Sequence, residues 1–218
     1  MSAAPLDPRE RSAIIRDSIG VGVATGAYGV GFGAVSVASG LSIAQTCALS
    51  LLVFTGASQF ALVGVVAAGG APLSGAATAL MLGTRNTLYG LRLAPLLAWH
   101  GVRRLLAAQV VIDESTAMSI TRESRPAARL GFLVTGLSVF VLWNLATLLG
   151  AIAGDALGDP RRYGLDAAVG AAFLALLWPR LAVLRNRYVA AAAAAVALVT
   201  VPFVPAGTPV LAAAGVAV

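Results

Sequence analysis

The sequence predicts an all-α, polytopic membrane protein with about seven hydrophobic segments. Three observations support this prediction. The chain of 218 residues is 59% hydrophobic and only 11% charged, whereas soluble domains carry roughly a quarter charged residues. Apolar runs recur along the whole chain and are separated by short polar links. All basic residues are arginines, and most of them lie in those links, as topology determinants do.

The same composition excludes several classes of protein. Because the chain has no lysine, it has neither a P-loop lysine nor a Schiff-base lysine. A single cysteine, Cys47, and a single histidine, His100, form no conventional zinc site and no disulfide. The net charge of +6 is distributed over the links between apolar runs, so we expect no nucleic-acid partner. We also expect no metal and no cofactor.

A polar tail, residues 1–12, is expected to precede a single transmembrane domain, residues 13–218. The first span is predicted from Ile14 to Ala38. It contains two GxxxG patterns, a spacing that lets another helix approach closely; they are formed by Gly22 with Gly26 and by Gly29 with Gly33. We expect these two faces to be buried, in part against a second small subunit.

The second segment, Ile43 to about Val66, contains the stretch FTGASQF at positions 54–60. Ser42 is placed to cap this segment. In hydrocarbon, a break in a helix is tolerated only where the freed backbone groups face protein, water or a ligand. The stretch therefore predicts either an interrupted helix beside a binding site or close helix packing, through the small and polar residues Thr55, Gly56, Ser58 and Gln59.

The third segment, Leu73 to Leu97, contains the sequence GTRNTLYGLRLAP and is also expected to be interrupted. Arg85 lies near its middle. Because an arginine at that depth costs about 2.5 to 3.5 kcal/mol on insertion scales, it is expected to face a cavity, a carboxylate or a partner helix. Arg92 lies nearer the end of the segment, where snorkelling is a sufficient explanation.

The fourth segment, Leu105 to Ile120, is short and polar for a span, since it carries Gln109, Asp113 and Glu114. We leave open whether it crosses the membrane, re-enters it or lies along the interface.

Three further segments complete the chain. Leu130 to Ala153 and Asp166 to Leu184 are predicted spans. Val189 to Val201 and the apolar tail that ends at Val218 are each too short to cross alone. Together they predict one interrupted span or two half-helices.

The arginines predict a multi-pass protein of the cytoplasmic (inner) membrane with a cytoplasmic N-terminus. Two readings remain open: either all segments cross, or the second and third make one crossing and 105–120 makes none. In both readings most of the arginines outside the membrane lie on the cytoplasmic side. Both readings also agree on everything after Leu130.

Three motifs resemble, in order and spacing, the signatures of the AzlC-type branched-chain amino acid permeases. They are FTGASQFAL at 54–62, TRNTLYGLRLAP at 84–95 and IDES at 112–115; the usual wording in that family is close to FAGASQFAA, LRHLLYGASLAP and TDE. WNLATLLG at 143–150 and GLD at 164–166 extend the resemblance. It implies a permease, expected to export neutral amino acids such as valine, leucine and isoleucine, that works with a small membrane subunit of the AzlD type.

The zwitterionic substrate that the resemblance implies needs a cation for its carboxylate, and carbonyls or an acid for its ammonium group. Arg85 is the candidate cation, and Tyr89, one turn away, is a candidate to close the pocket. The candidate polar contacts are Gly56, Ser58, Gln59 and Asn86. Asn86 stands where the family commonly has a histidine.

Two roles are open for Asp113 and Glu114. Either of them is a proton-coupling acid, or it forms an ion pair with Arg85 that only holds helices together. This structural role for Arg85 remains an alternative to substrate binding.

The residues leave two other classes of protein as alternatives. A structural or assembly subunit without a substrate site is the main alternative. An intramembrane enzyme is disfavoured, because the chain has no nucleophile elbow and no HExxH motif. The residues alone leave open the transport direction, the coupling ion, the preferred amino acid and the oligomeric state.

Overall fold

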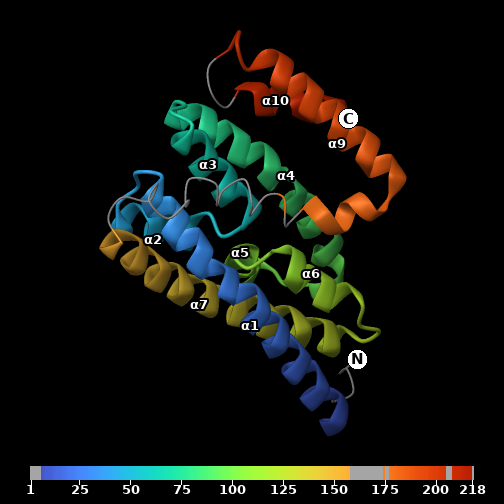
Figure 1. The fold of residues 1–218 in the computed structure, drawn as a ribbon. Helices are drawn as coiled ribbons and strands as arrows, with labels where there is room; N and C mark the ends of the chain where they lie inside the picture. Colours follow the sequence, from blue (N-terminus) through green and yellow to red (C-terminus); the bar gives the residue numbers. More distant parts are fainter. Residues whose placement is uncertain (1–5, 158–173, 175–176, 205–207, 218) are drawn as a thin grey trace.

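The computed structural model describes residues 6–157, 174, 177–204 and 208–217, and every regular element within them is a helix (Figure 1). The predicted all-α class is therefore confirmed. The elements are α1 (Pro8–Ala38), α2 (Ile43–Leu52), α3 (Ala57–Ala67), α4 (Pro72–Leu97), α5 (Gly101–Ala108), α6 (Asp113–Ile120), α7 (Arg125–Ala156), η3 (Trp178–Ala182), α9 (Leu184–Thr200), α10 (Thr208–Ala214) and η4 (Gly215–Ala217).

The two longest helices, α1 and α7, lie side by side along one edge of the molecule (Figure 1). Both are long and apolar enough to cross a membrane, and within the described ranges no other helix meets both conditions. Gly22 of α1 faces Ser138 of α7, and Gly33 faces Thr147. Since the residue numbers rise together, the two helices run in the same direction, as both topology readings require.

Four glycines allow α1 and α7 to touch backbone to backbone. Gly22, Gly26, Gly29 and Gly33 are all buried. A Cβ at Gly29 would lie 2.5 Å from the Trp143 carbonyl oxygen, and one at Gly33 would overlap the Thr147 carbonyl. The glycines therefore form one face and not two, and α7 covers it, so they are buried as expected.

The first helix begins earlier than the predicted tail allowed. Asp7 is its N-cap, with Oδ1 accepting a hydrogen bond of 3.1 Å from the Arg9 backbone N–H. Pro8 occupies the first turn, where its fixed φ and missing N–H are favourable. These residues start the helix at Pro8, so part of the stretch 1–12 belongs to α1.

The second segment is interrupted, as predicted. It begins with a capping box, in which Ser42 Oγ accepts from the Gln45 N–H at 3.2 Å and Gln45 Oε1 accepts from the Ser42 N–H at 2.8 Å. The helix stops at Leu52 and restarts at Ala57. Gly56, between the two halves, has φ of +56°, a conformation that L side chains rarely adopt.

The third segment is not interrupted, and that part of the prediction is wrong. α4 is a continuous helix, with Pro95 in its last turn. Polar side chains such as Arg85 and Asn86 do not require a broken backbone, because they reach neighbouring segments from an intact helix. Pro95 lacks a backbone N–H, but because it lies in the last turn, its missing hydrogen bond does not interrupt the helix.

The segment 105–120 is a second interrupted stretch. α5 ends at Ala108 and α6 begins at Asp113, so these residues do not form a single straight span. The final segment is also divided, into α9 and α10, as predicted. Most of the predicted span Asp166 to Leu184 lies outside the described residues.

Each helix break has a buried apolar residue that belongs to the core formed with α1 and α7. Phe54, from the first break, and Ile112, from the second, belong to one apolar cluster with Phe32 and Trp143. Phe32 stacks on Trp143 at a centroid distance of 6.0 Å and meets Phe60 edge to face at 5.4 Å. This aromatic core holds the two breaks in the interior of the molecule, next to the middle of α4.

Candidate functional site

One face of α4 makes hydrogen bonds and an ion pair with both helix breaks. Arg85 Nη1 lies 3.0 Å from Asp113 Oδ2, at the first residue of α6. Arg85 Nη2 donates to the Thr55 carbonyl oxygen at 3.4 Å, immediately before α3. The starts of α3 and α6 therefore meet at a single guanidinium group.

Two neighbours of Arg85 strengthen this junction. Asn86 Nδ2 donates to the Val111 carbonyl oxygen at 3.1 Å. One turn further along, the Tyr89 hydroxyl donates to Asp113 Oδ1 at 2.5 Å. Asp113 thus accepts from both Arg85 and Tyr89. The carboxylate is also favourably placed at the N-terminus of α6, where the helix dipole stabilises negative charge.

Side-chain amides replace helical bonds at the first break. Gln59, which is fully buried, accepts from the Gly56 N–H at 3.0 Å and donates to the Leu49 carbonyl oxygen at 3.4 Å. Gln109 donates to the Leu51 carbonyl oxygen at 2.8 Å and so links the second break to the first. Freed backbone groups in an apolar interior must find such partners.

Ser115 plays the same part at the second break. Its hydroxyl donates to the Val110 carbonyl oxygen at 2.6 Å and accepts from the Ile112 N–H at 3.1 Å. Glu114, beside it, accepts from the Thr25 hydroxyl of α1 at 3.5 Å. Asp113 and Glu114 therefore have different partners, and Asp113 is the acid paired with Arg85.

A cavity of about 790 Å³ lies against the first break and α4. Its polar wall includes Thr55, Ser58 and Asn86, and its apolar wall includes Leu62 and Leu80. The Ser58 side chain is 1% exposed, and within the described ranges its hydroxyl has no hydrogen-bond partner. A buried hydroxyl without a partner costs free energy unless a ligand or water satisfies it, so Ser58 makes this cavity a candidate binding site.

The charges next to this cavity are partly exposed. The side chains of Arg85 and Asp113 keep 29% and 40% of their surface exposed. Among the residues that the structure describes, none bonds Arg85 Nε. The guanidinium group therefore has donor capacity left after it has bonded Asp113 and Thr55.

The residues expected in the site fall into three groups. Ser58 and Asn86 line the cavity. Arg85 and Tyr89 do not line it but are joined at Asp113, next to Thr55, which does. Gly56 and Gln59 shape the break itself.

Sequence reasoning passed over Thr87 and Thr84, which also line the cavity, and Ser115, which supports the second break. The motif IDES at 112–115 contains Ser115 and could have indicated its role. No sequence signal separated Thr84 and Thr87 from ordinary helix-surface threonines. Across the described ranges, no group of three or more His, Cys, Asp or Glu side chains is placed to hold a metal ion.

No curated protein and no solved structure matches the chain. A protein-family model described as "AzlC protein" matches residues 20–157. The match covers more than half of the chain and runs from α1 to the end of α7, so it contains both helix breaks and the α4 residues that bond to them. The chain therefore belongs to the AzlC family, and its apolar helices α1 and α7 fit the membrane, transport-related role that this membership indicates.

Proposed function

We propose that this protein is a secondary transporter that exports neutral branched-chain amino acids, such as valine, leucine and isoleucine. One observation carries the proposal: the ion pair of Arg85 and Asp113 joins two helix breaks beside a cavity that contains the unpaired Ser58 hydroxyl. Substrate sites of many secondary transporters are formed by discontinuous helices whose ends point at the substrate.

The ion pair is complementary to a zwitterion. The substrate carboxylate binds the Arg85 side chain, which keeps 29% of its surface exposed, and a planar guanidinium group can offer it two parallel hydrogen bonds. The substrate ammonium group binds Asp113 or the Thr55 carbonyl oxygen. The neutral charge of the pair selects a ligand that itself carries one positive and one negative group.

The cavity favours an aliphatic side chain. Besides Ser58 and Asn86, its lining includes the apolar side chains of Leu52, Leu62 and Leu80. An aliphatic side chain buried there gains about 25 cal/mol for each Å² removed from water. A polar side chain gains nothing comparable.

Binding of valine to the purified protein tests this function. The Arg85→Lys variant keeps the positive charge but loses the planar pair of donors, so valine binding weakens by about tenfold or more. Arg92→Lys, on the same helix, serves as the control with unchanged binding. An Arg85→Ala variant that is folded and binds valine as tightly as wild type would refute the proposal.

A transport assay in membrane vesicles tests the direction of transport. Export predicts that everted vesicles accumulate labelled valine when the protein is present, whereas an importer gives accumulation in right-side-out vesicles. Asp113→Asn and Glu114→Gln identify the coupling acid. We propose that one of them removes the dependence on the pH gradient without reducing the amount of folded protein.

A structural subunit without a substrate site is the second candidate. The specific observation in its favour is that Arg85, Asn86 and Tyr89 already bond groups of the protein. If these bonds only hold the breaks together, the double variant Arg85→Ala and Asp113→Ala accumulates in normal amounts, unlike the single variants. It also still assembles into the complex of which this protein is a subunit. Valine binding is then absent from the wild type as well. We propose the transporter and not an enzyme.

We further propose a multi-pass arrangement of about seven segments in the inner membrane with a cytoplasmic N-terminus, together with an AzlD-type small subunit. An impermeant thiol reagent applied to intact cells should miss a cysteine placed at Asn186 and label one placed at Asp159. Co-purification with a co-expressed small membrane protein of the AzlD type tests the partnership. Labelling at Asn186 alone would reverse the topology.

A further inference from the structure

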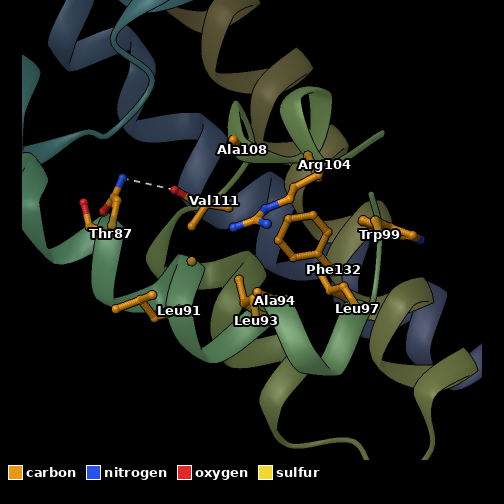
Figure 2. Close-up of a pocket in the computed structure, with 13 residues that line it drawn as sticks. Thr87, Leu91, Leu93, Ala94, Leu97, Trp99, Arg104, Ala108, Val111 and Phe132 are labelled. Atoms are coloured by element: carbon orange, nitrogen blue, oxygen red, sulfur yellow. Dashed lines mark hydrogen bonds between the residues drawn. The ribbon is translucent and has the colours of Figure 1, made fainter. Parts of the chain in front are cut away.

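A second cavity, of about 410 Å³, lies on the other side of the bond between Asn86 and Val111. Both residues line this cavity and the larger one described above. Figure 2 shows its walls: Leu91 and Leu97 come from α4, Phe132 from α7 and Trp99 from the link between α4 and α5. No acidic side chain lies among the described residues that line it.

Arg104 points into this cavity. In Figure 2 its side chain extends from α5 and places the guanidinium group between Val111 and Phe132. Two other arginines near this cavity have partners: Arg129 Nε donates to the Leu97 carbonyl oxygen at 2.7 Å, and Arg85 is paired with Asp113. Arg104, like Arg92 and Arg103, is an exposed residue, but of these three only Arg104 lines the cavity. For Arg104, the described part of the chain offers no hydrogen-bond or ion-pair partner.

The apolar wall is held in place independently of any ligand. Trp99 meets Phe132 edge to face at 5.8 Å, and the Arg129 guanidinium carbon lies 5.7 Å from the centre of the Trp99 ring. Arg129 also fixes the end of α4 through the Leu97 carbonyl. The cavity therefore combines one unpartnered guanidinium with a preformed aromatic and aliphatic wall.

We propose that this cavity binds a small monocarboxylate with a branched aliphatic or aromatic tail. The carboxylate binds Arg104 through two parallel hydrogen bonds, and the tail packs against Leu97, Trp99 and Phe132. An ammonium group is not required, since the described wall has no acid to receive it. The volume falls within the usual range for small-molecule sites, about 300 to 1,000 Å³.

This chemistry has two sources. A carboxylate with a branched tail is present both in a free branched-chain carboxylic acid and in a branched-chain amino acid that is being transported along Asn86. The site itself does not depend on the proposed transport function, because it rests on Arg104 and the wall around it.

The experiment is a titration of the full-length protein, reconstituted in nanodiscs of zwitterionic lipid, with isovalerate. Wild type and Arg103→Gln, a neighbouring arginine that does not line the cavity, should bind isovalerate with equal affinity. Arg104→Gln should bind at least about tenfold more weakly, as expected for the loss of a charged hydrogen-bond pair, and Arg104→Lys should recover part of the affinity. Isobutylamine, which has the tail but no carboxylate, should not bind.

Three results identify the source and the site. Competition between L-valine and isovalerate in the wild type assigns the site to the amino acid in passage, and absence of competition assigns it to a free acid. Ser58→Ala should leave isovalerate binding unchanged, since Ser58 lines only the larger cavity. The proposal is overturned if wild type does not bind isovalerate, or if Arg104→Gln with an unchanged melting temperature binds it as tightly as wild type.

Discussion

The Nη1 atom of Arg85 lies 3.0 Å from the Oδ2 atom of Asp113, and this ion pair joins the middle of α4 to the first residue of α6. The same guanidinium bonds the Thr55 carbonyl oxygen in the other helix break. A single side chain therefore positions the starts of two interrupted segments that are far apart in the sequence.

The first prediction separates the structural and binding roles of this pair. Arg85→Ala leaves the Asp113 carboxylate without its cation, and Asp113→Ala leaves the guanidinium without its anion, so each single variant should be less abundant in the membrane than wild type. The double variant removes both charges and should recover much of the protein amount. If the pair binds substrate, the recovered double variant still binds valine more than about tenfold more weakly. Normal valine binding by the folded double variant would assign the pair to structure alone.

The second prediction concerns Ser58. Ser58→Ala removes a hydroxyl that has no partner in the described structure, so the melting temperature should stay the same or rise slightly. If the hydroxyl bonds the substrate, valine affinity should fall about fivefold, which corresponds to the loss of a hydrogen bond worth roughly 1 kcal/mol. Calorimetric titration and a thermal melt measure the two effects. Lost stability with unchanged affinity would show that Ser58 supports the fold and not the ligand.

The third prediction tests the backbone at the first break. Gly56 has φ of +56° and ψ of −84°, so Gly56→Ala forces an L residue into a disfavoured conformation at a cost of about 1 to 3 kcal/mol. The space around this position is open, so the cost comes from the backbone and not from a clash. The melting temperature should fall by several degrees.

Gly20→Ala is the matched control for Gly56. Gly20 lies inside α1 with open space around its Cβ position and has no positive φ. Alanine there should stabilise the helix slightly. Equal effects of the two substitutions would contradict the strained conformation at Gly56.

The fourth prediction tests the contact between α1 and α7. Gly29→Leu places a side chain against the Trp143 carbonyl oxygen, and the two helices must separate. The variant should give little folded protein in size-exclusion chromatography. Gly31→Leu, two residues away with nothing within 4 Å of the Cβ position, should behave like wild type. Normal folding of Gly29→Leu would mean that α1 and α7 do not pack as described.

The sequence by itself determined the helical class and the resemblance to the family, and it left the stretch 54–60 as either a break or a close packing contact. The small and polar residues of FTGASQF indicated a break, and the structure shows how it forms: Gly56 has a positive φ, and Gln59, at the third position of the new helix, reaches back to the Gly56 N–H. Both effects act over a few residues, so a sequence pattern carries them. The GxxxG spacing of α1 is also a local pattern, so the sequence showed its glycines.

Only the tertiary structure decided what lies against these features. The sequence did not reveal that α7 covers all four glycines, that α4 stays continuous, or that Asp113 and not Glu114 pairs with Arg85. Nor did it distinguish Arg104 from the adjacent Arg103, since the two differ only in which one points into a cavity. Partner choice and cavity lining depend on residues distant in the chain, and no local pattern encodes the distance between them.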